Sequence, residues 1–135
     1  MKITVSTTVR APIEQAWRAY TTPDDITLWN AASEDWHTTR ASVDLRVGGA
    51  FSSRMEAKDG SMGFDFAGTY TRIEPLQLIE YRFGDRMAQV EFANGVEGVR
   101  VTVTFDSENT FPVEQQRAGW QAILDSFGRY VAARQ

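Results

Sequence analysis

The sequence predicts an α+β fold in which a curved antiparallel β-sheet wraps around one long C-terminal helix, with two short helices after the first strand. Polar and apolar residues alternate through most of residues 36–105, which is typical of half-buried strands. Turn-forming pairs such as Asp59-Gly60 divide this region into short strands joined as a meander. From Pro112 to Arg134 apolar residues recur every three or four positions, which indicates an amphipathic helix.

Length and composition limit the class of protein. The chain has 135 residues, with no linker, charge block or internal repeat, so we expect a single domain over residues 1–135. Hydrophobic residues make up 42% and charged residues 24%, as in ordinary globular proteins. A net charge of -4 argues against a nucleic-acid partner, because phosphate binding needs clustered Lys and Arg. The absence of cysteine excludes disulfides, thiolate metal sites and a cysteine nucleophile.

The first residues predict an edge of the sheet followed by two helices. Residues 3–9 alternate apolar and polar side chains and lack the unbroken apolar run of a signal peptide or membrane span. We therefore expect a cytoplasmic protein with no membrane insertion. Pro12 suits the first turn of a helix, and Thr22-Pro23-Asp24-Asp25 resembles a capping box at the start of a second helix. The inward residues of these helices are expected to be Ile13, Ala16, Trp17, Tyr20, Ile26 and Trp29.

The alternation assigns the strand residues to two faces. The expected turn pairs are Gly48-Gly49, Asp59-Gly60, Glu74-Pro75, Gly84-Asp85 and Asn94-Gly95. The expected apolar face carries Phe51, Ser53, Met55, Phe64, Phe66, Tyr70, Ile79, Tyr81, Phe83, Val99, Val101, Val103 and Phe105. The expected polar face carries Arg54, Glu56, Asp65, Glu80, Arg82, Arg100, Thr102 and Thr104. One face of the sheet is thus available for a covering layer.

The C-terminal helix is that layer. Val113, Trp120, Leu124, Phe127 and Val131 form its apolar stripe. An isolated helix of this length is marginal in water, so the stripe must be buried on the apolar face of the sheet. We expect the two surfaces to enclose a small-molecule pocket.

Three separated motifs carry a family resemblance: TTPDDITLWNAASEDWH, DLRVGGAFSSRMEAKDGSMGFDFAGTYT and GWQAILDSFGRYV. Together they resemble the activator-of-heat-shock-protein-90-ATPase-like family of the START-like, birch-pollen-allergen-like helix-grip superfamily, from Ile3 to Val131. The resemblance implies a helix-grip fold with a deep cavity between helix and sheet. In the superfamily such cavities take lipids, sterols, polyketides or plant hormones, and a few members are cyclases or hydrolases. Eukaryotic co-chaperones of the family carry an additional N-terminal domain, and this sequence starts at the first strand, so we do not expect chaperone activation.

The candidate ligand-binding residues are Trp29, Trp36, His37, Phe51, Phe66, Tyr70, Tyr81, Gln116, Arg117, Trp120 and Leu124. The aromatic members serve equally well as core or as cavity wall. His37 is the only histidine and, by itself, is more typical of a structural residue than of a catalytic one. Arg117 either binds a ligand carboxylate or extends to water from the start of the helix. The carboxylates of Glu56 and Asp65 are expected on the surface, without a catalytic role.

These observations favour binding of a small hydrophobic or amphipathic, lipid-like molecule, without catalysis, cofactor or metal. One alternative is an enzyme of the polyketide cyclase or hydrolase type, for which His37, Arg117 and Tyr70 would have to converge in the cavity. Another is a chaperone-associated interaction protein of the stress response. The sequence leaves a homodimer open.

Overall fold

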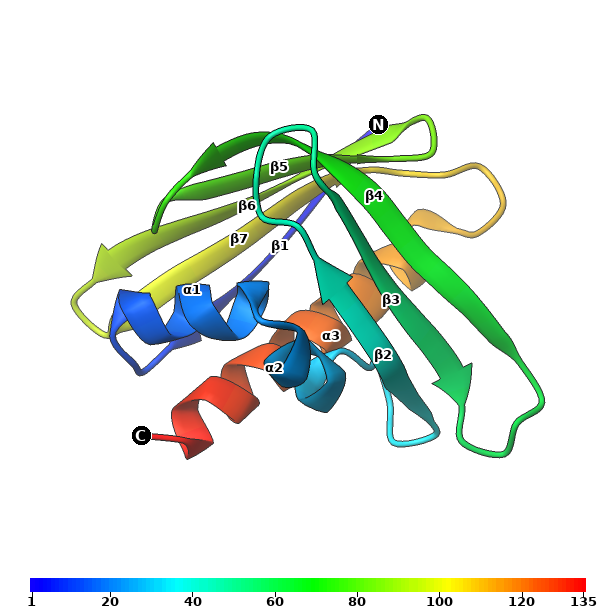
Figure 1. The fold of residues 1–135 in the computed structure, drawn as a ribbon, viewed down its shortest axis with the longest axis horizontal. Helices are drawn as coiled ribbons and strands as arrows, with labels where there is room; N and C mark the ends of the chain where they lie inside the picture. Colours follow the sequence, from blue (N-terminus) through cyan, green and yellow to red (C-terminus); the bar gives the residue numbers. More distant parts are fainter.

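The computed structural model describes all 135 residues and confirms the predicted α+β class (Figure 1). The elements are β1 (Lys2–Val9), α1 (Ile13–Thr21), α2 (Pro23–Trp29), β2 (Trp36–Val43), β3 (Ala50–Ala57), β4 (Gly63–Glu74), β5 (Leu78–Phe83), β6 (Arg86–Gly95), β7 (Gly98–Asp106) and α3 (Val113–Ala133). None of the three helices has the length and hydrophobicity needed to cross a membrane.

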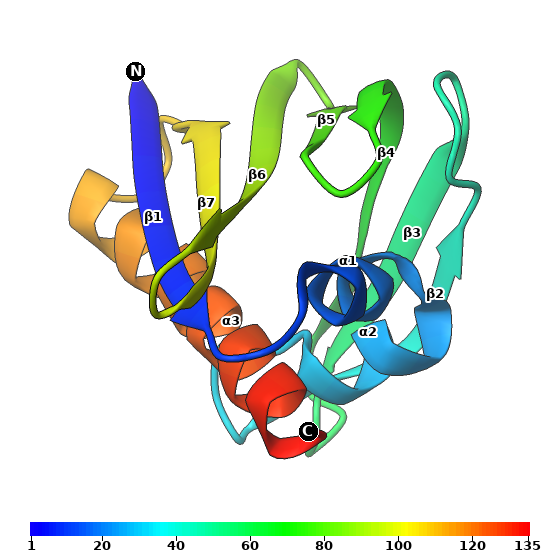
Figure 2. The same cartoon turned by 90° about the vertical axis from the view of Figure 1, so that its left-hand side faces the viewer.

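All seven strands form one antiparallel sheet in the order β1-β7-β6-β5-β4-β3-β2. Strands β2 to β7 follow one another as the predicted meander, and β1 pairs with β7 in an eight-residue register from Lys2↔Asp106 to Val9↔Val99. The sheet curls, so that β1 and β7 stand opposite β2 and β3 with the helices between them (Figure 2). The sheet is therefore a half-barrel, and its edge strands β1 and β2 lie on opposite sides of the opening.

The predicted faces of the strands are confirmed. The concave face holds the buried apolar residues of β5 and β7, among them Ile79 and Phe105. On the convex face, Arg54 pairs with Glu56 at 3.0 Å and with Asp65 at 3.6 Å. The carboxylates of Glu56 and Asp65 thus belong to a surface ion-pair cluster, as expected from the alternation.

One predicted turn lies two residues further along the chain. Asn94 and Gly95 are still paired in the β6–β7 ladder, opposite Val99 and Gly98, and the chain reverses at residues 96–97. Gly98 has a φ of +140°, and a Cβ atom there would lie 2.4 Å from the carbonyl oxygen of Val9. The close approach of β1 therefore makes Gly98, rather than Gly95, the glycine that this hairpin requires.

The predicted capping box is also absent. Thr22 is the N-cap residue of α2 and Pro23 starts the helix, but the Thr22 side chain makes no capping hydrogen bond. The Asp25 carboxylate instead accepts a hydrogen bond from the Tyr130 hydroxyl of α3. The carboxylate that the sequence pattern assigns to a local cap is used in a contact between two helices.

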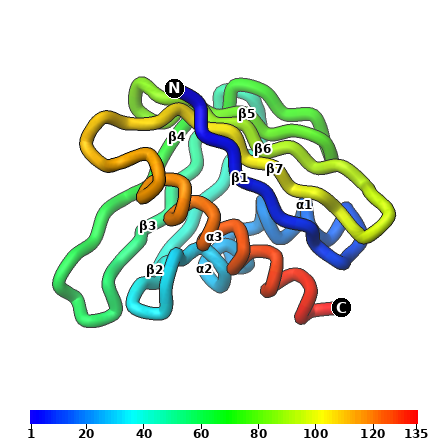
Figure 3. The backbone as a smooth tube through the Cα atoms, turned by 180° about the vertical axis from the view of Figure 1, so that it is seen from behind, coloured from blue at the N-terminus to red at the C-terminus, as the bar shows by residue number.

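Helix α3 lies beside β1 (Figure 3). Gln121 donates to the backbone oxygen of Ser6 at 2.9 Å. Gly128 is buried against Thr7, whose Oγ1 would be 3.4 Å from a Cβ at that position. On the other side, the Ser126 hydroxyl donates to the backbone oxygen of Trp29 at 2.8 Å. The helix is therefore held by the β1 edge and by α2.

Phe127 joins the three helices in the core. Its side chain is fully buried, and its ring meets the rings of Tyr20 and Trp29 edge-on, with centroids 5.1 and 5.0 Å away. The Trp29 indole also donates to the backbone oxygen of Ala19 at 2.9 Å, which fixes α2 against α1. This aromatic group closes one end of the half-barrel.

Phe127→Ala should lower the free energy of unfolding by about 3–5 kcal/mol, because the truncated side chain leaves a cavity among the three helices. Urea denaturation measures the change. The control Arg129→Ala removes an exposed side chain of the same helix and should change the free energy by less than about 0.5 kcal/mol. Equal effects of the two substitutions would contradict this role of Phe127.

Candidate functional site

A cavity of about 420 Å³ lies between α3 and the concave face of the sheet. It is bordered by 21 residues, of which 17 are hydrophobic. Eight of the predicted site residues border it, namely Trp29, Trp36, Phe51, Phe66, Tyr70, Tyr81, Trp120 and Leu124. Protein interiors rarely leave a space much larger than a water molecule, so this cavity is a distinct feature of the fold.

His37 does not belong to the cavity. It is exposed and pairs with Glu56 of β3, whereas its neighbour Trp36 points inward and borders the cavity. Adjacent residues of a strand point to opposite faces, so the two side chains cannot share the site. The prediction that groups His37 with Trp36 is wrong for this reason.

Gln116 and Arg117 also lie outside the cavity, because the first turns of α3 face β1 and the loop before the helix. The buried Gln116 side chain accepts a hydrogen bond from the Glu108 N–H at 2.9 Å. It donates to the backbone oxygens of Glu108 at 3.1 Å and Phe111 at 2.7 Å. Arg117 donates to the backbone oxygen of Thr4 at 3.3 Å and contacts the Glu114 carboxylate at 3.4 Å. Gln116 thus holds the loop, and Arg117 binds the β1 edge.

These positions separate the residues that the enzyme hypothesis requires. Tyr70 borders the cavity, His37 is exposed on the other face of β2, and Arg117 lies against β1. The three side chains do not converge on one point, so they cannot act together on one substrate.

Trp120 forms the wall of the cavity nearest the start of α3. Its ring stacks on Phe105 of β7, with centroids 3.9 Å apart and an angle of 10° between the planes. It also meets Phe66 of β4 at 6.1 Å and Phe83 of β5 at 5.8 Å. The indole therefore packs across the sheet at one end of the cavity, and Trp29 borders the cavity from α2.

Three tyrosines bring polar groups to this apolar space. Tyr70 and Tyr81 are directly opposite on β4 and β5, and Tyr20 comes from α1. Burial raises the pKa of Tyr70 to about 12 and also raises the pKa values of Tyr20 and Tyr81. No hydrogen bond contributes to these three shifts, whereas the raised pKa of Tyr130 includes its bond to Asp25. All three tyrosines border the cavity, so they are the residues that could offer a hydroxyl group to a bound molecule.

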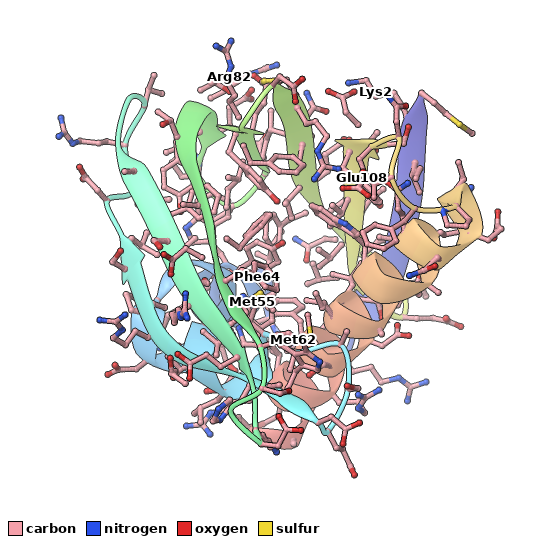
Figure 4. All side chains as sticks on the ribbon, turned by 90° about the vertical axis from the view of Figure 1, so that its right-hand side faces the viewer. Lys2, Met55, Met62, Phe64, Arg82 and Glu108 are labelled. Carbon is pink, nitrogen blue, oxygen red and sulfur yellow. The ribbon has the colours of Figure 1, made fainter.

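Apolar side chains also gather on the β3–β4 hairpin beside the cavity. Figure 4 shows Met55, Met62 and Phe64 between this hairpin and α3. Phe64 and Met55 border the cavity, and the Phe64 ring lies 5.9 Å from that of Trp36. Met62 and Phe64 are nonetheless 65% and 48% exposed. Apolar side chains are therefore exposed beside the cavity as well as buried within it.

Several bordering residues lie outside the predicted site. Met55, Ser53 and Phe64 are on the predicted inner face, and Tyr20 is on the predicted apolar side of the first helix, so the pattern contained a signal for them. Arg86 is different, because it directly follows the Gly84-Asp85 turn and reads as part of a polar loop. The only sequence signal for the inner face is that Arg86, Ala88 and Val90 are alternate residues and would share one face of a strand.

The comparisons with known proteins agree with the fold. The family model described as "Activator of Hsp90 ATPase homolog 1-like protein" matches residues 10–132. The chain belongs to this family. The sequence resemblance is thereby confirmed, and the helix-grip arrangement in this chain is the one that members of the Activator of Hsp90 ATPase homolog 1-like family share.

Solved structures of similar proteins extend this result. An AHSA1-like protein from Aeromonas hydrophila is 49% identical, with 99% of this chain and 94% of that chain covered and a TM-score of 0.93. A protein from Cytophaga hutchinsonii is 44% identical, with 98% and 93% covered and a TM-score of 0.84. A protein from Chromobacterium violaceum is 26% identical, with 98% of both chains covered and a TM-score of 0.87. No curated protein matches this family member.

The tyrosines should resist ionisation in the folded protein. Because all four tyrosine pKa values are raised, little tyrosinate should form at about pH 10, where half of the tyrosines of an unfolded chain are ionised. The folded state then binds more protons than the unfolded state, so stability should fall as the pH rises above about 10. Tyrosinate absorbance of folded and urea-unfolded protein measures both effects. Half-ionisation of the folded protein at that pH would contradict the burial of the hydroxyl groups.

Gln116→Leu should lower the free energy of unfolding by about 1–3 kcal/mol, because it leaves backbone groups of the loop at residues 108–111 without partners. The matched control is Gln115→Leu, which replaces an exposed neighbour and should have a much smaller effect. Chemical denaturation compares the two variants. If the two effects are equal, the side-chain bonds of Gln116 do not hold the loop.

Proposed function

We propose that this protein binds a small hydrophobic or amphipathic, lipid-like molecule in the cavity beneath α3. The observation that supports the proposal most strongly is an apolar cavity of about 420 Å³ that is bordered by Tyr20, Tyr70 and Tyr81. Small-molecule sites commonly combine a volume of about 300–1,000 Å³, an apolar lining and a few polar groups that fix orientation.

The chemistry of the lining favours binding over catalysis. Of the 21 bordering residues 17 are hydrophobic, and neither histidine nor carboxylate is among them. A ligand would gain free energy mainly from the removal of apolar surface from water. The tyrosine hydroxyls would orient a polar group of that ligand without having to transfer a proton, since their raised pKa values keep them protonated.

The proposal concerns the cavity alone. The family name refers to activators of the Hsp90 ATPase, and nothing in the cavity chemistry depends on a chaperone partner. A cytoplasmic location stays a prediction from the sequence, a chaperone-associated role in the stress response stays an alternative, and a homodimer stays open.

A neutral fluorescent probe, N-phenyl-1-naphthylamine, tests the proposal by titration. The purified protein should increase the probe's fluorescence. Ser53→Phe should weaken binding at least about tenfold, because the new ring occupies space beside the buried Ser53 of the inner face.

Ser52→Phe is the matched control. Ser52 is the adjacent residue of β3 and points to the convex face, so the variant should bind the probe as the original protein does. Circular dichroism establishes that both variants are folded. An absence of probe binding, or equal binding by the folded Ser53→Phe variant, would refute the proposed function.

A further inference from the structure

Arg86 is the one charged residue that borders the cavity. It starts β6 and lies opposite Phe83, while Ala88, two residues on, lies opposite Tyr81. Ala88 is buried at 1% exposure, and alternate residues of a strand share a face. The Arg86 side chain therefore belongs to the concave face of the sheet, although arginines are rare on such surfaces.

The Arg86 guanidinium is held in place but has no carboxylate partner. Its Cζ lies 4.4 Å from the centre of the Phe83 ring, and Nη1 donates to the backbone oxygen of Asp106 at 3.2 Å. The Asp106 carboxylate is occupied by Lys2, at 2.7 Å, and by the Met87 N–H, at 2.8 Å. None of the ion pairs of the chain includes Arg86. Most of its N–H donors are thus unused.

The neighbours of Arg86 on the same wall are also donors. Tyr81 is its diagonal neighbour across the β5–β6 pair, and Tyr70 lies opposite Tyr81 on β4. Diagonal neighbours on one face lie within reach of long side chains. This wall therefore combines one positive charge with phenolic hydroxyls. One acidic group, Asp44, adds to the effect of burial in raising the pKa of Tyr70, but it does not border the cavity and is paired with Arg46. Such a surface is complementary to an anionic oxygen.

We propose that Arg86 binds the carboxylate of an amphipathic monocarboxylate, such as a fatty acid, whose apolar part lies in the cavity toward Leu124 and Trp29. The inference rests on the proposed function and specifies the class of ligand. A guanidinium matches the planar carboxylate with two parallel hydrogen bonds. One guanidinium balances one negative charge, so a carboxylate fits better than a phosphate monoester, which carries nearly two charges at neutral pH. Phe83, on which the guanidinium rests, packs against Trp120, so the carboxylate lies at the Trp120 end.

Decanoate and 1-decanol test the assignment, because they share an apolar chain and differ in charge. Each competes with N-phenyl-1-naphthylamine for the cavity. The original protein should bind decanoate about 10- to 100-fold more tightly than 1-decanol. Arg86→Gln should abolish this preference while 1-decanol and the neutral probe still bind.

Arg82→Gln is the matched control, since it makes the same change at an exposed residue of β5 that Figure 4 shows outside the cavity. This variant should keep the preference for decanoate. Equal affinities of the original protein for the two compounds, or a preference that survives Arg86→Gln, would overturn the inference while the proposed function stands. If the neutral probe fails to bind the original protein, the proposed function itself is refuted.

Discussion

The packing of α3 against β1 and α2 determines which part of the interior is a packed core and which part is a cavity. Phe127 fills the junction of the three helices, and Gln121 and the buried Gly128 contact β1. Because the helix is held at this edge, it covers the β1–β7 side of the curled sheet (Figure 2). The sheet residues that border the cavity lie mainly on β2 to β5. Burial of an amphipathic stripe thus stabilises the fold and creates the cavity at the same time.

Aromatic side chains keep that space from being filled by collapse of the core. Phe51 packs on Tyr70 and Tyr81, with ring centroids 5.2 and 4.9 Å apart, and Trp120 stacks on Phe105. The rings of Phe51, Tyr70 and Tyr81 support one another along the sheet, and Trp120 supports Phe105 from α3. Contacts of this kind add to the free energy of burial. The aromatic residues that line the cavity are therefore stabilised although no side chain fills the space between them.

Local periodicity was sufficient to predict the elements and the faces of the strands, because the alternation of side chains depends on the chain's own backbone. It could not predict partners from distant segments. Asp25 bonds to Tyr130 instead of capping its own helix, and Gly98 is required because β1 passes close to it. The sequence likewise predicts Gln116 in the cavity, whereas its side chain bonds to the preceding loop. The size of the cavity depends on the position of α3 relative to the sheet, and local sequence periodicity carries no information about that position.

Arg117 and Arg86 show how the helix and the sheet contribute differently to the cavity. Arg117 of α3 faces β1 and the Glu114 carboxylate, and the helix gives the cavity only Trp120, Ile123 and Leu124. Arg86 comes from β6, which pairs with β5 from Arg86 onward and with β7 from Ala88 onward. The polar groups of the site therefore lie mainly on the rigid sheet, while the helix supplies apolar surface. Substitutions in α3 would therefore alter the shape of the cavity, whereas most of its polar groups, apart from Tyr20 of α1 and Asn30, come from the strands.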